Sequence, residues 1–166
     1  MNTSNQISIQ QAPTLAALYR ERVARTPHAI AYVQYDAGQE SWQRYSWLQT
    51  ARQVARWQQA MLGTGLKRGE RMVIMCHNSW EWVICDQAAL GLGIIVVPVF
   101  MNDRPDNIAW ILNNSGASLL LIESQEQWDA LLSVEDQLGG LKQIISLVPL
   151  HNTHDRVTAL DDWLPE

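Results

Sequence analysis

From residue 47 onward, helical stretches and short apolar runs alternate four times along the chain. Helical spacing of apolar residues, with caps at either end, predicts helices over residues 48–62, 80–92, 105–115 and 125–138. The apolar runs that separate them occupy residues 71–76, 94–99, 118–122 and 143–148. This alternation is typical of a parallel sheet whose strands are joined by right-handed helical crossovers. The predicted fold class is therefore α/β, with a largely parallel sheet flanked by helices.

Local signals set the expected limits of these elements. Ser46 and Ser79 are suited to cap the starts of two helices, and Gly116 is suited to end a third. The run 94–99 is β-branched and apolar on both faces, which favours a central strand of the sheet. The run 143–148 is expected to be the last strand, followed by a polar tail with a short turn at 160–164.

The segment before the alternation predicts a separate small unit. Residues 14–25 have helical spacing, and Thr26-Pro27 ends that helix because a residue before proline disfavours helical geometry. Two runs follow, 29–35 and 42–47, joined by the turn Asp36-Ala37-Gly38. They predict an N-terminal β-hairpin attached to the parallel sheet.

Composition excludes several classes of protein. The 166 residues suit one ordinary domain, and 47% hydrophobic residues exclude a disordered chain. Twelve Lys+Arg against 17 Asp+Glu give a net charge of −5, so we expect no nucleic-acid partner. Charged residues are only 17%, and tryptophan occurs eight times, so we expect the tryptophans mainly in packing, with some covering an interface.

No targeting or membrane-spanning segment is recognisable. Residues 1–11 are rich in Asn, Gln and Ser and do not resemble a signal peptide. The longest apolar run, 94–101, is interrupted by Pro98 and is far shorter than a transmembrane helix. Cys76 and Cys85 form no metal-binding pattern and are expected to be buried, reduced thiols. These features indicate a cytoplasmic location.

The residues alone give no catalytic constellation and no metal site. The glycines between 63 and 69 follow a helix and precede a strand, which is the reverse of a phosphate-binding loop, so they predict a cap and turn. His77 lies at a strand end, where it is either a structural loop residue or a side chain facing a cleft at the carboxyl edge of the sheet. His151 and His154 lie in the polar tail and are expected to be solvated.

The order of several short motifs resembles the start of an AMP-forming adenylating enzyme. These motifs are Pro13-Thr14-Leu15, Arg25-Thr26-Pro27, Tyr45-Ser46-Trp47-Leu48, the turn 66–74 with Gly69-Glu70-Arg71, His77-Asn78-Ser79-Trp80-Glu81-Trp82, the strand region 89–99 and the segment 107–122. Residues 81–88, 98–100 and 134–145 are similar to the pattern of the long-chain fatty acyl-CoA synthetases in particular. The resemblance extends from Pro13 to about Leu164.

The resemblance implies a part of a longer enzyme. It divides the chain into a disordered segment at 1–12, an α/β N-terminal subdomain at 13–150 and a polar tail at 151–166 that leads to a phosphate loop beyond the chain. The parent would use ATP, Mg and CoA to join fatty acid to CoA, releasing AMP and pyrophosphate. Its partners would be the remainder of the enzyme, with peripheral membrane contact and a homodimer as further expectations. The fragment itself is expected to bind no cofactor and to be inactive alone.

Two residues are proposed at the rim of the nucleotide or CoA site. Asn102 and Arg104 lie in the loop after the run 94–99, at the carboxyl end of that strand. No family catalytic residue has a counterpart in this sequence. Two other readings stay open: a segment of another adenylating enzyme, which activates an aryl or amino acid, and a stand-alone binding module of the same fold.

Overall fold

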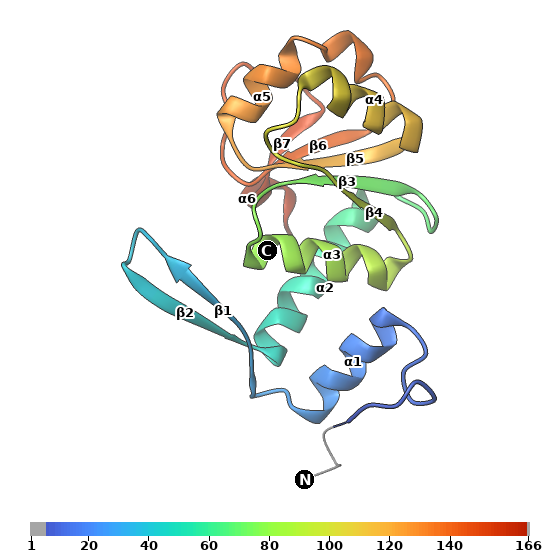
Figure 1. Ribbon diagram of the computed structural model, residues 1–166, viewed down its shortest axis with the longest axis vertical. Helices are drawn as coiled ribbons and strands as arrows, with labels where there is room; N and C mark the ends of the chain where they lie inside the picture. The colour runs from blue at the N-terminus through green and yellow to red at the C-terminus, as the bar shows by residue number, and fades with distance from the viewer. Residues whose placement is uncertain (1–5, 166) are drawn as a thin grey trace.

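The computed structural model describes residues 6–165, and within them a parallel sheet lies between two layers of helices (Figure 1). The sheet has five strands in the order β4-β3-β5-β6-β7. Their bounds are β3 Arg71–Met75, β4 Ile95–Pro98, β5 Ala117–Ile122, β6 Gln143–Ser146 and β7 Val157–Ala159. All pairings in this sheet are parallel, which confirms the predicted fold class.

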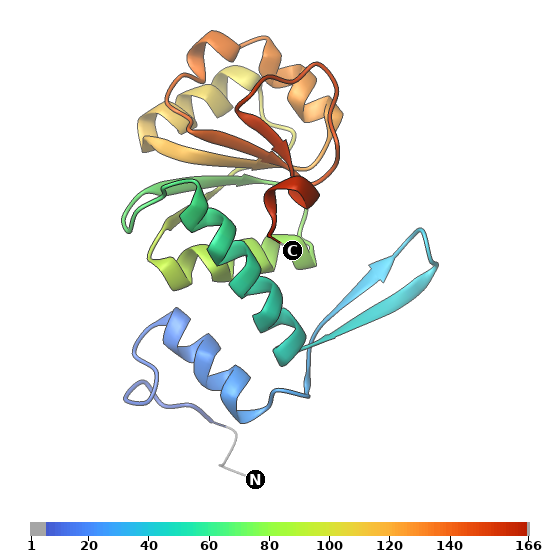
Figure 2. The same cartoon turned by 180° about the vertical axis from the view of Figure 1, so that it is seen from behind.

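The helices divide between the two faces of the sheet, as Figures 1 and 2 show. One face is covered by α2 (Trp47–Gly63) and α3 (Trp80–Leu92), with α1 (Leu15–Arg25) packed on their outer side. The other face is covered by α4 (Pro105–Ser115) and α5 (Gln125–Leu132). The short helix α6 (Leu160–Trp163) returns to α2, where the rings of Trp163 and Trp57 meet edge to face at 5.7 Å.

The central strand β5 supplies both cores because successive residues of a strand point to opposite faces. All six of its residues are buried. Leu119 and Leu121 join the core beneath α2 and α3, whereas Leu120 and Ile122 join the core beneath α4 and α5. A strand that is apolar on both faces is what a parallel sheet with two helical layers requires.

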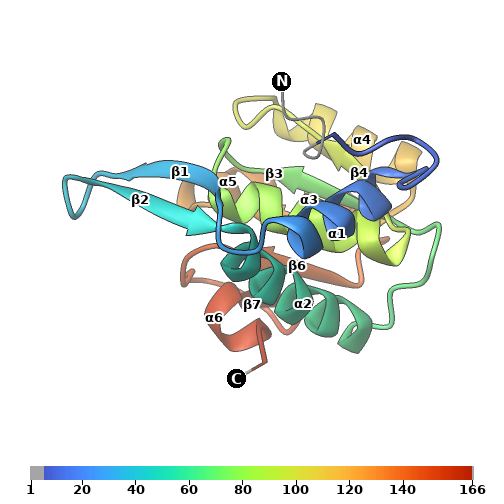
Figure 3. The same ribbon diagram turned by 90° about the horizontal axis from the view of Figure 1, so that it is seen from below.

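The predicted hairpin is confirmed as β1 (Ile30–Asp36) and β2 (Ser41–Ser46), which pair antiparallel. Its turn is held by the Asp36 carboxylate, whose Oδ1 accepts the backbone N–H groups of Gly38 and Gln39 at 2.9 and 3.1 Å. Seen from below in Figure 3, the hairpin extends away from the layered body. It is joined to that body at its base and by contacts with the start of α3.

The predicted caps are confirmed by hydrogen bonds. Ser46 forms a full capping box with Gln49, and the Ser79 hydroxyl accepts the Trp82 N–H at 3.1 Å. Gly116 ends α4 at a φ of 60°, in the left-handed region where a side chain is strained.

Three expectations about the helices and strands were wrong. The run 94–99 forms an edge strand, β4, where Ile95 is 52% exposed, and Pro98 removes one N–H donor. The helix expected to reach residue 138 ends at Leu132, where the Ser133 hydroxyl donates to the Ala130 carbonyl, and a 3₁₀ turn (η2, Glu135–Gln137) follows. The strand 143–148 is not the last, because β7 pairs beside it. Because β7 has only three residues, all of them half-buried, its sequence shows no alternation of apolar and polar residues that would predict a strand.

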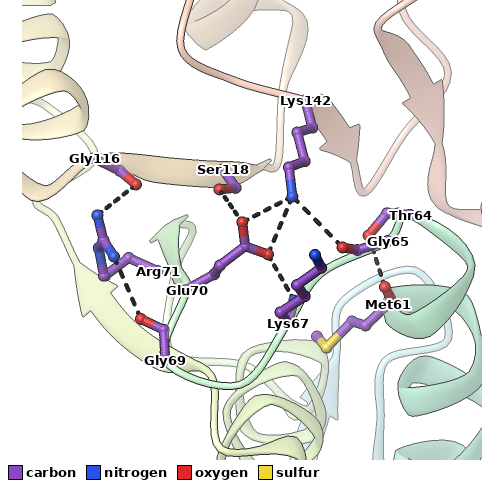
Figure 4. A network of polar contacts seen from close by, with 10 residues as sticks. All are labelled: Met61, Thr64, Gly65, Lys67, Gly69, Glu70, Arg71, Gly116, Ser118 and Lys142. Carbon is purple, nitrogen blue, oxygen red and sulfur yellow. Dashed lines mark hydrogen bonds and ion pairs between the residues drawn. The ribbon is translucent and has the colours of Figure 1, made fainter.

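At the amino edge of the sheet, polar side chains tie three neighbouring strands together (Figure 4). The Glu70 carboxylate accepts hydrogen bonds from Lys142 Nζ at 2.8 Å, from the Lys67 N–H at 2.6 Å and from the Ser118 hydroxyl at 3.3 Å. The neighbouring Arg71 guanidinium donates to the carbonyl of Gly116 at 2.9 Å. The starts of β3, β5 and β6 are therefore joined by one charged network.

The Glu70 carboxylate should make stability depend on pH. Hydrogen bonding from Lys142 holds the pKa of Glu70 below its usual value of 4.5 in the folded chain. Its contribution is therefore present above the unfolded pKa and is lost as pH falls through the folded pKa. We expect Glu70→Gln to lower the free energy of unfolding at neutral pH by about 1 kcal/mol or less, with the difference from the unsubstituted chain vanishing in acid.

Urea denaturation at several pH values measures this effect. Asp155→Asn is the matched control, because Asp155 is an exposed carboxylate for which the structure shows no hydrogen bond or ion pair in residues 6–165. Equal pH dependence of Glu70→Gln and the unsubstituted chain would show that the charge of Glu70 contributes nothing to stability.

Candidate functional site

The crossover connections diverge between β3 and β5. The chain leaving β3 enters α3 on one face of the sheet, whereas the chain leaving β5 enters α5 on the opposite face. In open α/β sheets, ligands bind outside the carboxyl ends of the strands at such a switch point, because the diverging loops leave a crevice there. The carboxyl ends of β3 and β5 therefore define the candidate site.

A histidine–carboxylate pair occupies this point. Met75 and Ile122 are paired in register at the ends of the two strands, so the residues that follow them lie close together. The Glu123 carboxylate accepts the backbone N–H of His77 at 2.6 Å through Oε2, and its Oε1 pairs with the imidazole Nδ1 of His77. The His77 side chain is 71% exposed, against 23% for Glu123. His77 thus presents its free ring edge to solvent while Glu123 holds it.

His77 lies in the loop at the carboxyl edge of the sheet and is held there by Glu123, and its role as a cleft residue stays a prediction. Sequence reasoning missed its partner Glu123. The available signal was position: Glu123 directly follows the apolar run 118–122, just as His77 closely follows the run 71–76.

The N-terminus of α3 lies beside this pair, and two of its N–H groups already have side-chain partners. The backbone N–H of Trp80 donates to the Gln34 side-chain oxygen at 2.6 Å, and that of Trp82 donates to Ser79. The ring of Tyr45 stacks on Trp80 with centroids 3.8 Å apart. Helix N-termini bind anions through unpaired N–H groups, and here the hairpin occupies one of these groups, the N–H of Trp80.

An open groove of about 610 Å³ separates the hairpin from the start of α3. Its walls are mostly aromatic and apolar: Tyr32, Val33, Tyr35, Trp42, Trp80, Trp82 and Val83, with Gln34, Asn78 and Ser79 as its polar residues. The groove therefore offers large apolar contact area with few charged groups.

The sequence-predicted residues Asn102 and Arg104 lie in the loop between β4 and α4. Both are exposed, and Arg104 Nη2 pairs with Asp106 at 3.2 Å. Within residues 6–165, no hydrogen bond or ion pair connects either residue to His77 or Glu123. Their place at the rim of a nucleotide or CoA site stays a prediction.

The two cysteines are confirmed as buried and free. Burial, with Glu123 nearby, raises the pKa of the Cys76 thiol to about 12, and burial raises the pKa of Cys85 well above its usual value. Neither thiol is ionised near neutral pH, so neither acts as a nucleophile there.

The histidines of the tail do not form a site. His154 is half-buried, with its ring against that of Trp128 at a centroid distance of 5.4 Å, so the expectation that it is solvated was wrong. An aromatic neighbour that is distant in sequence accounts for its burial.

The described residues provide no cluster of side chains suited to hold a metal ion. Across residues 6–165, His, Cys, Asp and Glu form no group of three or more that could hold a metal. The glycines at 65 and 69 lie in the turn before β3, at the opposite edge of the sheet from the candidate site. Among residues 6–165, no helix is long and apolar enough to cross a membrane.

A parallel sheet between two layers of helices, with crossovers that diverge between β3 and β5, defines an open α/β protein. The comparison with known families narrows this class: residues 19–163 match the family described as AMP-binding enzyme. The chain belongs to that family.

Named relatives in the family are acyl-CoA ligases. The long-chain-fatty-acid–CoA ligase FadD15 of Mycobacterium tuberculosis is 22% identical over 152 residues, which cover 91% of this chain and 25% of the relative. The ligase ACSBG2 of Xenopus laevis is 28% identical over 132 residues, covering 80% of this chain and 18% of the relative. The chain therefore spans a quarter or less of the length of these relatives.

Solved structures share the fold. A fatty acyl CoA synthetase of Mycobacterium tuberculosis matches with a TM-score of 0.71 at 20% identity, covering 84% of this chain and 27% of that one. The anthranilate CoA ligase AuaEII, solved with anthranoyl-AMP, matches with a TM-score of 0.77 at 18% identity, covering 98% and 29%. At these identities the likeness establishes the arrangement of helices and strands.

The Glu123 carboxylate should protect the loop after β3. Replacing Glu123 with Ala removes the acceptor of the His77 N–H, so we expect faster amide hydrogen exchange at His77 and a loss of about 1 kcal/mol in the free energy of unfolding. Exchange measured by NMR at single amides tests this, with Glu126→Ala, an exposed carboxylate in the first turn of α5, as the control. Unchanged exchange at His77 would contradict the assigned hydrogen bond.

Proposed function

We propose that this chain is the N-terminal part of a long-chain fatty acid–CoA ligase. Such an enzyme joins a fatty acid to CoA and cleaves ATP, and its products are acyl-CoA, AMP and pyrophosphate. The observation that carries the proposal is the family match over residues 19–163 together with relatives named as long-chain-fatty-acid–CoA ligases. The motif order from Pro13 onward supports the same assignment.

Within that enzyme, this chain would supply scaffold and one wall of the cleft. Adenylate formation concentrates negative charge on a phosphate and an oxyanion, which positioned cations and N–H groups must stabilise. In residues 6–165 the first turn of α3 is engaged by Gln34 and Ser79, and no metal-binding cluster exists. The reacting groups would therefore come from other parts of the parent, and the isolated chain would be inactive.

Two parts of this chain would border the cleft. The His77–Glu123 pair would hold the loop at the switch point, where the carboxylate fixes both the ring and the backbone of His77. Asn102 and Arg104 would lie at the rim, where the exposed guanidinium of Arg104 is suited to phosphate groups of ATP or CoA. We place the parent in the cytoplasm, with peripheral contact to the membrane that holds its fatty acid substrate.

A ligase for another acid is the second candidate. The structural match to an anthranilate CoA ligase has a higher TM-score than the match to the fatty acyl CoA synthetase, although both likenesses concern the fold. The acid is selected by pocket residues that have no counterpart here, so a substrate comparison on the longer enzyme separates the two candidates.

The isolated chain should catalyse no ATP–pyrophosphate exchange with palmitate. Incubation of the 166-residue protein with ATP, Mg²⁺, palmitate and labelled pyrophosphate measures this, with a complete fatty acyl-CoA synthetase as the positive control. Exchange above the enzyme-free background would show that the reacting groups lie within these residues. Exchange by the longer enzyme with anthranilate but not palmitate would replace the fatty acid assignment.

Arg104 should contribute to nucleotide or CoA binding in the longer enzyme. If its guanidinium contacts a phosphate group, Arg104→Ala removes an exposed charge contact worth about 1 kcal/mol, so we expect KM for ATP or CoA to rise about fivefold with kcat unchanged. Arg52→Ala, at an exposed arginine of α2, is the control. Unchanged KM for both ligands would remove Arg104 from the site.

A further inference from the structure

A single arginine of α2 holds the backbone at the end of α6. The half-buried Arg56 guanidinium donates to the Pro165 carbonyl through Nε at 3.1 Å and through Nη2 at 2.8 Å, although 109 residues separate the two. Its remaining nitrogen, Nη1, donates to the Gln53 side-chain oxygen at 3.2 Å. Within residues 6–165 no carboxylate pairs with Arg56. The cation therefore fixes the path of the backbone instead of forming an ion pair.

A second contact fastens the same segment to α2. Trp57, which follows Arg56 on the helix and is 2% exposed, meets the ring of Trp163 edge to face at 5.7 Å. Leu160 and Leu164 pack beside Trp163 against the core beneath α2 and α3. Figures 2 and 3 both show α6 lying beside α2. Residues 160–165 are thus tied to a helix that covers the central sheet.

The exit from α6 has little conformational freedom. Leu164 is extended, with φ −75° and ψ 134°, because a residue before proline disfavours helical geometry. The ring of Pro165 fixes its own φ. A peptide unit is planar, so the direction of a carbonyl also sets the direction in which the chain continues. Since Arg56 holds that carbonyl, α2 determines the direction in which the chain leaves α6.

We propose that Arg56 is a positioning residue of the longer enzyme, which places the part of the chain beyond Pro165 relative to the cleft. The inference rests on the proposed function, in which this chain supplies scaffold and other parts of the parent supply the reacting groups. Catalytic groups must be held within about 0.5 Å of their productive positions, and a misplacement of about 1 Å can lower the rate about 100-fold. The contact between Arg56 and Pro165 gives the connection that precision.

Arginine is suited to this role in a way that lysine is not. A guanidinium is planar and presents its donors in a fixed fork, so two N–H groups on one carbonyl fix the direction of that carbonyl. An ammonium group is a point charge with rotatable donors, and it would hold the carbonyl without fixing its direction. Arg56→Lys is therefore expected to preserve part of the function, whereas Arg56→Ala removes the contact.

Kinetics of Arg56→Ala in the longer enzyme test the proposal. We expect kcat for ATP–pyrophosphate exchange to fall about tenfold or more with KM for ATP changed less than about twofold, because the reacting groups are misplaced while contacts to the nucleotide remain. Arg56→Lys should give an intermediate kcat. Arg52→Ala, at an exposed arginine one turn earlier on α2, is the matched control and should leave kcat unchanged.

Two further readouts separate positioning from stability. Rates are divided by the amount of folded enzyme, measured by circular dichroism, so a less stable Arg56→Ala enzyme with an unchanged kcat would overturn the proposal. In the 166-residue chain, the Leu164 N–H donates to the Leu160 carbonyl at 2.9 Å. Arg56→Ala should speed amide hydrogen exchange at Leu164 about tenfold or more, because the end of α6 opens locally. Unchanged exchange there would show that Arg56 does not hold the segment.

The exchange reaction uses whichever acid the longer enzyme activates, so the two proposals can fail separately. Activation of anthranilate but not palmitate would refute the fatty acid assignment and would still allow the Arg56 variants to be compared. Activation of palmitate with equal kcat in Arg56→Ala and the unsubstituted enzyme would support the proposed function and refute the role of Arg56.

Discussion

The parallel pairing of β3 with β5 is the interaction on which the rest of the structure depends. The two strands are nearly fully buried, and each contributes alternate residues to the two separate cores. Helices on both faces can pack only because this pair presents apolar side chains on both sides. The same pairing brings the starts of β3 and β5 side by side, and likewise their ends. The register of the buried apolar residues therefore decides which polar groups meet at each edge of the sheet.

The two edges have different chemistry as a result. At the amino edge, the charges of Glu70 and Arg71 are fully occupied by Lys142, Ser118 and the end of α4, which makes that edge structural. At the carboxyl edge, Glu123 holds His77 from one side only and leaves the ring exposed to solvent. The family assignment agrees with this division, since ligands of open α/β sheets bind at the carboxyl edge.

The sequence predicts what local patterns and buried runs determine. The hairpin, the caps at Ser46 and Ser79 and the parallel class follow from residue types at short spacing. The edge position of β4 does not follow from local patterns, because its apolar residues would suit the centre of a sheet equally well. Only its pairing with β3, which is distant in sequence, places it at the edge. The His77–Glu123 contact escapes for the same reason: 46 residues separate its partners, and strand register alone brings them together.

The strand order β4-β3-β5 also has a consequence for the time course of folding. β3 meets β5 only after the chain has completed the excursion through α3, β4 and α4, so the central pairing closes a long loop. The hairpin needs only its own turn and can form in about 1–10 µs, whereas non-local parallel pairings form far more slowly. During synthesis and refolding, the hairpin can therefore form and reopen before α3, which holds it in the folded chain, is packed on the sheet, and its rings are exposed to other chains in that interval.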